Sequence, residues 1–281
     1  MPFAEVLLSP FVLALFGLCI GSFLNVVIHR LPLMLERGWK MESADLLGVA
    51  HEATPALTLS TPGSRCPSCG HVIPWYENIP VASWLWLRAR CSACKVRISA
   101  RYPLIEVVTG ALFALVGWRF GAQPVALVWC VFCAMLVALA GIDWDTTLLP
   151  DNITFPLLWA GLVCAALGWT IPLPDAVWGA VAGYLSLWSV YWLFKLATRK
   201  EGMGFGDFKL LAALGAWLGW EMVLPIVLAA SAIGAMVGIA MKMSAALREG
   251  RYVPFGPFLA GAGIVVLFAG QDRVLGWMRF F

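Results

Sequence analysis

Long apolar runs separated by short polar connections dominate the chain. A helix needs about 20 mostly apolar residues to cross a bilayer. The pattern therefore predicts an all-α polytopic membrane protein with about eight transmembrane helices. Seven spans are the alternative if the sixth run, which is short and opens at a glycine-rich turn, is re-entrant. The runs fall at 6–28, 104–120, 124–142, 153–170, 176–196, 207–220, 222–243 and 256–272.

Composition supports the membrane assignment. The 281 residues are 61% hydrophobic and only 12% charged, whereas about a quarter of a soluble domain is charged. The net charge of +3 and the lack of a basic block argue against a nucleic-acid partner. The first apolar run has no basic segment before it and exceeds the core of a signal peptide, so we predict a retained first span in the lipid bilayer.

Lys and Arg mark one side of the membrane, because basic connections stay in the cytoplasm. The distribution predicts that both termini lie outside and that the loops near 145, 200 and 250 are cytoplasmic. One set of connections holds most of the basic residues: Arg30, Arg37, Lys40, Arg65, Arg88, Arg90, Lys95, Arg97, Arg101, Lys195, Arg199, Lys200, Lys242, Arg248 and Arg251. The opposite set holds Arg119, Arg273 and Arg279.

This pattern divides the chain into three parts. We expect a first transmembrane helix at 1–29, a polar cytoplasmic insert at 30–103 and a transmembrane core at 104–281. Only the insert is a polar block long enough to fold by itself.

Two cysteine pairs lie within the insert, in Cys66-x2-Cys69 and Cys91-x2-Cys94. Paired knuckles with this separation are typical of tetrathiolate zinc sites. Disulfides are the competing interpretation, but the predicted compartment is reducing. We therefore predict that these cysteines form a structural zinc site, because four protein ligands leave no open position for catalysis.

The remaining cysteines and the histidines carry weaker signals. Cysteines within apolar runs are expected to be buried small hydrophobes; these are Cys19, Cys130, Cys133 and Cys164. Four thiolates already complete a zinc site, so the histidines are expected to be surface or capping residues; these are His29, His51 and His71.

Two aspartates lie at predicted span boundaries. Asp143 ends one run and Asp207 begins another, and acidic residues there are costly unless they are paired, hydrated or used. Gly204 and Gly206 allow a close backbone approach beside Asp207. Two carboxylates that come together share a proton, as in an aspartic protease. We therefore expect Asp143 and Asp207 to form a catalytic pair.

Two further aspartates lie shortly after Asp143 in the sequence. Asp145 and Asp151 lie in a short connection. A helix cap is the simplest role for an aspartate there.

The GxGD motif at 204–207 is short. Four further segments of the chain, however, match the sequence pattern of one family in the same order. The chain resembles the type IV prepilin peptidase family over nearly its whole length. A departure is Ala89 in LRARC, where the family pattern has Gly. The resemblance rests on GSFLNVVIHRLP (21–32), CPSCGHVIPWYENIPVASWL (66–85), ISARYPLIE (98–106), IDWDTTLLPD (142–151) and GMGFGDFKLLAALGAWLG (202–219).

The resemblance implies a bifunctional enzyme of the bacterial inner membrane with its active site at the cytoplasmic face. Members remove the basic leader of type IV prepilins and type II secretion pseudopilins. They then N-methylate the new N-terminal residue with S-adenosylmethionine. The resemblance implies that Asp143 and Asp207 catalyse cleavage and that the cysteine segment accompanies methyl transfer.

The residues themselves say less about methyl transfer. No G-x-G-x-x-G follows a predicted strand, so no Rossmann-type donor site is predicted. The product amine must lose its proton before it attacks the methyl group. Glu77 and Glu106 are candidate bases, and pairing with Arg101 or another loop arginine is the structural alternative for each.

Two other functions are compatible with parts of the pattern. One is an intramembrane aspartic peptidase without methyltransferase activity, against which the zinc insert argues. The other is a membrane scaffold or transporter whose zinc loop binds partners, against which the placement of Asp143 and Asp207 argues.

Overall fold

A computed structural model describes residues 2–49, 57–200, 202–244 and 253–278. Within these ranges regular structure is helical, apart from two isolated antiparallel bridges, Arg65 with Val72 and Arg90 with Arg97. The predicted all-α class is confirmed. The chain forms two compact units, Met1–Ala138 and Leu139–Phe281.

The first unit contains a long helix, a second span packed on it and the insert. Its elements are α1 (Pro2–Leu7), α2 (Pro10–Leu47), η1 (Trp75–Asn78), α3 (Ala82–Trp86), α4 (Arg101–Phe120) and the first part of α5 (Val125–Thr146). Ser9 caps α2 by accepting from the N–H of Val12, and Gly48, at φ 65°, ends it. The helix therefore continues well past the boundary expected at 29.

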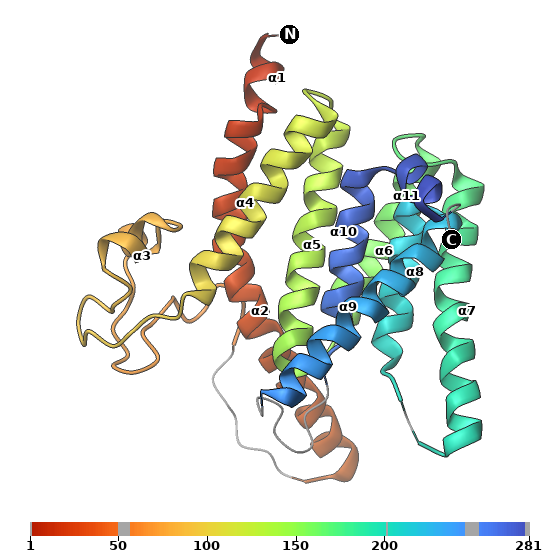
Figure 1. The fold of residues 1–281 in the computed structure, drawn as a ribbon. Helices are drawn as coiled ribbons and strands as arrows, with labels where there is room; N and C mark the ends of the chain where they lie inside the picture. The colour runs from red at the N-terminus through yellow and green to blue at the C-terminus, as the bar shows by residue number, and fades with distance from the viewer. Residues whose placement is uncertain (1, 50–56, 201, 245–252, 279–281) are drawn as a thin grey trace. The chain divides into compact units, whose positions relative to one another are not determined.

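The helices α2 and α4 pack together, as Figure 1 shows, and small residues line their contact. A Cβ on Gly17 would lie 2.9 Å from the Cα of Gly110, and one on Gly21 would lie 2.6 Å from the Cα of Glu106. Helices that present small residues four apart pack at close range in membranes. This contact fixes Glu106 beside α2.

The second unit is built around α8 (Phe205–Leu218), which contacts α6, α7, α9 and α10. Its other elements are α6 (Asp151–Ala166), α7 (Leu173–Thr198), η2 (Trp220–Met222), α9 (Val223–Met243), α10 (Gly256–Ala269) and α11 (Gln271–Met278). Gly179 of α7 lies directly against the backbone of Gly215, and Gly183 against Leu211. Close helix packing therefore buries α8, which carries Asp207 in its first turn.

The expected count of eight spans is not confirmed. Among the described residues, five helices are long and apolar enough to cross a membrane, or up to six if α10 and α11, bent by 106°, form one span. The helices α8 and α10 have 14 residues each. At 1.5 Å per residue such a helix is about 21 Å long, shorter than the roughly 30 Å hydrocarbon core.

The short helices α8 and α10 contact each other and run in the same direction. Asp143, Asp207 and Gly256 lie at one end, where Gly256 bonds to Asp143. At the other end, Gln271 at the start of α11 donates to the carbonyl of Leu218 at the end of α8. The starts of α8 and α10 therefore share one face.

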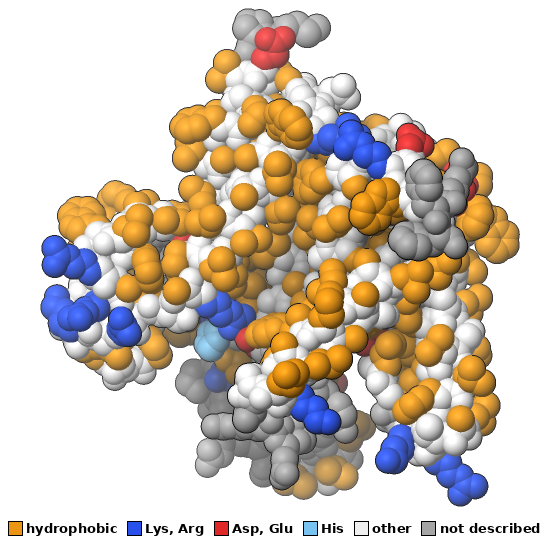
Figure 2. Space-filling model, viewed as in Figure 1, with side chains coloured by type: hydrophobic (Ala, Val, Ile, Leu, Met, Phe, Trp, Pro, Cys, Tyr) orange, Lys and Arg blue, Asp and Glu red, His pale blue; other side chains and the backbone are white. Residues whose placement is uncertain are grey.

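Surface chemistry fits a membrane protein with a basic insert. Large side chains such as Trp118 and Leu193 are 76% and 72% exposed, and hydrophobic side chains cover much of the helical surface in Figure 2. Lys and Arg side chains gather on the insert in the same view. The exposed basic residues of the insert include Arg65, Arg88, Arg90, Lys95 and Arg97.

Candidate functional site

Asp143 lies in the last turn of α5 and is 4% exposed. Its Oδ2 accepts a hydrogen bond of 2.9 Å from the backbone N–H of Gly256, the first residue of α10. A buried carboxylate needs such a donor, because burying an unpartnered charge is costly. The bond joins α5 to a helix that begins far along the chain.

Asp207 lies in the first turn of α8 and is 8% exposed. Gly204 is the N-cap of this helix, and Gly206 packs against Leu149 so closely that a Cβ there would lie 2.7 Å from the Cβ of Leu149. Gly206 therefore allows the start of α8 to lie directly on the connection that follows α5.

The structure brings the two aspartates together. Their carboxylates lie close enough for the charge of Asp143 to act on Asp207. Leu149 packs against both Gly206 and Gly256, the glycines that flank the two acids. Two buried carboxylates near each other cannot both ionise easily, because each negative charge opposes the other. This is the arrangement that acid and base catalysis by an aspartate pair requires.

The other two aspartates are not N-caps. Asp145 is exposed in the last turn of α5. Asp151 lies in the first turn of α6, whose N-cap is Pro150 without a side-chain hydrogen bond. Instead, Asp151 pairs with Lys209 of α8 at 2.7 Å. The capping interpretation is therefore wrong for Asp151, whose ion pair ties the start of α6 to α8.

Sequence reasoning missed Gly256, Leu149 and Lys209. Lys209 follows Asp207 by two residues, so the motif could have included it. Gly256 lies in PFGPF (254–258), where Gly-Pro is an ordinary turn signal. No local pattern connects that turn to Asp143, 113 residues earlier.

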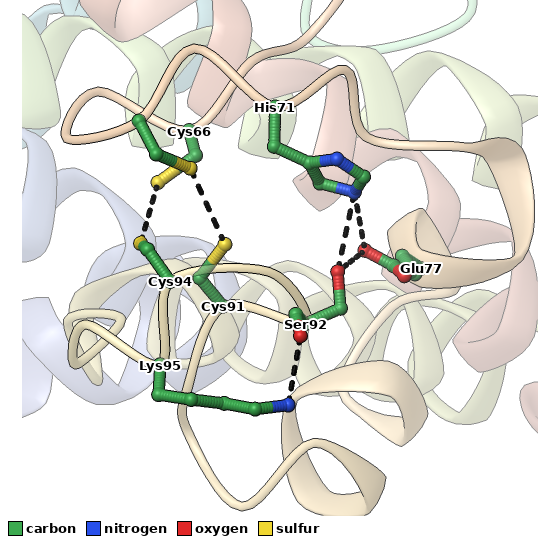
Figure 3. Close-up of polar contacts among 8 residues, drawn as sticks. Cys66, His71, Glu77, Cys91, Ser92, Cys94 and Lys95 are labelled. Atoms are coloured by element: carbon green, nitrogen blue, oxygen red, sulfur yellow. Dashed lines mark hydrogen bonds and ion pairs between the residues drawn. The ribbon is translucent and has the colours of Figure 1, made fainter.

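The four cysteines of the insert form one cluster, shown in Figure 3. Their sulfur atoms all lie within 4.8 Å of one another. The Sγ atoms of Cys66 and Cys94 are 3.8 Å apart, and those of Cys69 and Cys91 are 4.0 Å apart. Zn–S bonds of 2.3 Å in a tetrahedron place sulfur atoms about 3.8 Å apart. The cluster therefore fits a tetrahedral metal ion, and its thiols are free of disulfides.

The two knuckles share one local structure. In the first, the N–H of Gly70 donates to the carbonyl of Cys66 at 2.9 Å, and in the second, the N–H of Lys95 donates to that of Cys91 at 3.1 Å. Gly70 and Lys95 both have a positive φ, 71° and 59°. Each turn thus points its two thiols to the same side, where the other knuckle faces them.

The knuckle turns favour thiolates, the form that binds metal. Backbone N–H groups of Cys69 and Ser68 donate to Cys66 and lower its pKa to about 6. The N–H of His71 acts in the same direction on Cys69, but burial and the neighbouring thiols raise the pKa of Cys69 to about 11. Four thiols this close cannot all ionise unless a cation neutralises them. The cluster therefore has the chemistry of a metal centre.

Predictions for the remaining cysteines and histidines are mostly confirmed. Burial is as expected for Cys130, Cys133 and Cys164, but Cys19 is exposed on α2, so its predicted burial is wrong. His29 is exposed, and His51 lies outside the described residues, as do Arg248, Arg251 and Arg279.

His71 belongs to a polar cluster that links the two knuckles (Figure 3). Ser92, between Cys91 and Cys94, donates to Glu77 Oε2 at 2.8 Å. Nε2 of His71 lies 3.2 Å from the hydroxyl of Ser92 and 3.7 Å from Glu77. Glu77 therefore holds the knuckles to η1 and to each other.

Glu106 is buried in α4, with 8% of its surface exposed. Its Oε2 accepts a 2.7 Å hydrogen bond from the backbone N–H of Val81. Val81 has φ 60° and ψ −48° and precedes α3. A β-branched residue in this region is an outlier, so the bond holds a strained turn of the insert against a membrane helix.

Ala89, the departure from the family pattern, also has a positive φ of 58°. Glycine adopts this conformation without the steric cost that a Cβ adds. The backbone thus explains why glycine suits the position, and the second knuckle keeps its turn with alanine there.

Comparisons with known proteins cover almost the whole chain. Residues 15–120 match the bacterial peptidase A24 N-terminal domain, and residues 130–239 match the type IV leader peptidase family. No solved structure is significantly similar to the chain.

Several relatives carry the name prepilin leader peptidase/N-methyltransferase. The protein of Stutzerimonas stutzeri is 50% identical over 94% of this chain and 92% of its own length. That of Pseudomonas putida is 52% identical over 91% and 89%. That of Aeromonas hydrophila is 51% identical over 94% and 91%.

Proposed function

Because the chain belongs to the type IV leader peptidase family, we propose that it is a bifunctional membrane enzyme. It cleaves the basic leader from type IV prepilins, from type II secretion pseudopilins or from both. It then methylates the new N-terminal amine with S-adenosylmethionine as the donor. The name of its relatives supports both activities.

The buried pair of Asp143 and Asp207 carries the proposal for peptide cleavage. One carboxylate takes a proton from water, whose oxygen attacks the scissile carbonyl carbon, while the other carboxyl protonates the carbonyl oxygen. The resulting diol collapses as the C–N bond breaks and the leaving amine receives a proton. Burial of both side chains and the effect of one charge on the other support this assignment, because they favour one protonated and one ionised carboxyl group.

The cysteine cluster is proposed to hold one structural zinc ion. Cys66, Cys69, Cys91 and Cys94 would be its ligands, because their spacing fits a tetrathiolate tetrahedron. Four protein ligands leave no position for substrate. The residues of the knuckles then serve to hold the insert in shape.

Methyl transfer is proposed to depend on the insert at 30–103. The new amine has an ordinary pKa near 7.7–8.0 and must lose its proton before its nitrogen attacks the sulfonium methyl group. S-adenosylmethionine would supply the methyl group, with the demethylated thioether as the leaving group. Glu77 and Glu106 are the candidate bases, and each already has a hydrogen-bond partner in the insert.

The proposed location is the bacterial inner membrane, with the aspartate pair at the cytoplasmic face. Basic residues in the insert and at the end of α7 support this orientation. The leader of a prepilin is basic and lies on the same side, so the scissile bond and the aspartates would meet at the inner interface.

Asp143→Asn and Asp207→Asn test the proposal in cells that co-express a prepilin. Each change should lower cleavage by about 10⁴-fold or more, and the double variant should be scarcely worse than either single one, because the pair acts as a unit. Asp145→Asn, an exposed neighbour on α5, is the matched control and should cleave normally. The mass of the pilin N-terminus reports cleavage and methylation together.

A normal amount of processed pilin from either single variant, at normal accumulation of the enzyme, would refute the assignment of the catalytic pair.

A further inference from the structure

The start of α10 is aimed at Asp143. The bond between the Gly256 N–H and Asp143 Oδ2 is 2.9 Å long and fully buried. The first N–H groups of a helix have no partner within it. At the start of α10 the next residue, Pro257, has no N–H to offer. Gly256 is therefore the donor that this end of the helix presents to the carboxylate.

The position has no room for a side chain. A Cβ on Gly256 would lie 2.6 Å from Asp143 Oδ2 and 3.1 Å from Leu149 Cδ2. Its backbone does not lie in the left-handed region, so conformation alone does not require glycine. Glycine is required here because the carboxylate of Asp143 lies too close for a side chain.

The contact also favours a charged carboxylate. A backbone N–H that donates to a carboxylate stabilises its ionised form, and the positive end of the helix dipole acts in the same direction. Because Oδ2 is engaged by Gly256, Oδ1 is the oxygen of Asp143 left to take a proton from water.

We infer that Gly256 is a third part of the peptidase site, a positioning residue that fixes the Asp143 carboxylate for water activation. This inference rests on the proposed role of Asp143 and Asp207. It adds an element that neither acidic motif contains. The start of α10 completes a site otherwise formed by the end of α5 and the start of α8.

Gly256→Ala is the test, measured with purified enzyme and a prepilin substrate. The added methyl group displaces the carboxylate, and a displacement of about 1 Å in a catalytic group can cost about 100-fold in rate. We expect kcat to fall by about 100-fold and KM to stay within about twofold, because the substrate contacts remain. Methylation of a synthetic, already cleaved pilin peptide should be unchanged.

Gly261→Ala is the matched control, because it lies on the same helix and a Cβ there would meet nothing within 4 Å. It should cleave at the normal rate. Equal kcat values for Gly256→Ala and Gly261→Ala would overturn the inference. It would also be overturned if purified Gly256→Ala lost its cleavage and methylation activities, each per mole of enzyme, to the same extent.

If Gly256→Ala fails to accumulate, the double variant Gly256→Ala with Leu149→Ala replaces it. The second change removes the crowded contact with Leu149 and leaves the clash with Asp143. The kcat of this double variant should be at least tenfold lower than that of Leu149→Ala alone. Equal values would overturn the inference. Asp143→Asn separates the two proposals: cleavage by that variant refutes the catalytic pair, whereas its inactivity together with an active Gly256→Ala refutes only the role of Gly256.

Discussion

Glu106 connects a membrane helix to the insert through a single strained residue. The N–H of Ala82 donates to the carbonyl of Pro80 across Val81, and with φ 60° and ψ −48° Val81 is the centre of a classic γ-turn, a rare and strained conformation. Such strain costs about 1–3 kcal/mol and persists only where the surroundings impose it. The Glu106 carboxylate provides that constraint.

Substitution of Glu106 separates the two roles open to it. Glu106→Gln keeps an acceptor oxygen for the Val81 N–H but cannot take a proton, whereas Glu106→Ala leaves a donor without its partner, at a cost of about 1–3 kcal/mol. We expect the Gln variant to methylate normally and the Ala variant to give cleaved but poorly methylated pilin. The methylated fraction of cleaved pilin, measured by mass, is the readout.

Val81→Gly provides a second test of the positioning role of Glu106, because glycine adopts this turn without strain. Combined with Glu106→Ala, it should restore part of the methylation. Loss of methylation in Glu106→Gln, with normal cleavage, would instead identify Glu106 as the base for methyl transfer.

At the scale of elements, the insert is a small fold held by its knuckles. The hydrogen bonds of Ser92 and His71 with Glu77 join the knuckles to η1, but few large apolar side chains of the insert are buried. Domains of this kind gain much of their folding free energy from the metal. The insert should therefore depend on zinc far more than the helices of the second unit do.

Purified protein should contain about one zinc per chain. Serine at any of the four cysteines should release the metal and reduce methylation more than cleavage, because the aspartates lie in the other unit. Cys19→Ser, at an exposed thiol on α2, is the control and should keep both metal and activity. Metal content by mass spectrometry checks the first result, and a fully methylating, metal-free wild-type protein would refute the proposed structural zinc site.

Features formed by residues close together in the sequence could be predicted, whereas contacts between distant segments could not. The cysteine cluster was predictable because each knuckle is a four-residue turn with its ligands in fixed positions. Asp143 and Asp207 could be selected as candidates because glycines and span boundaries surround them, and their catalytic role stays a prediction. Gly256 was not, because its contact depends on how α10 packs against α5, which no periodicity records. The strained turn at Val81 was hidden for the same reason, since its partner lies on α4.

Helix lengths were predicted less well than helix positions. Apolar runs located the helical segments, but hydropathy does not show where caps and glycines end a helix. Gly204 and Gly219 limit α8 to 14 residues, and the bend after Ala269 divides the last run into α10 and α11. The number of long spans is therefore smaller than the number of apolar runs.

At the scale of the whole molecule, the residues proposed to cleave the substrate lie at one face of the second unit. In the second unit, the end of α5 and the starts of α6, α8 and α10 meet around Asp143, Asp151, Asp207 and Gly256. The connections near 147 and 203 therefore belong to one face. The distribution of basic residues predicts that this face is cytoplasmic.

Labelling of single cysteines tests that orientation. Thr147→Cys and Met203→Cys, in a background without the native cysteines that still cleaves prepilin, should resist a membrane-impermeant maleimide in intact spheroplasts and react after lysis. Trp169→Cys, exposed in the connection after α6, should react in intact spheroplasts, because α6 carries the chain to the opposite end of the unit. Reaction of position 147 or 203 before lysis would place the aspartate pair outside the cytoplasm, where the basic leader of a prepilin does not lie, and the proposed meeting of substrate and site would fail with it.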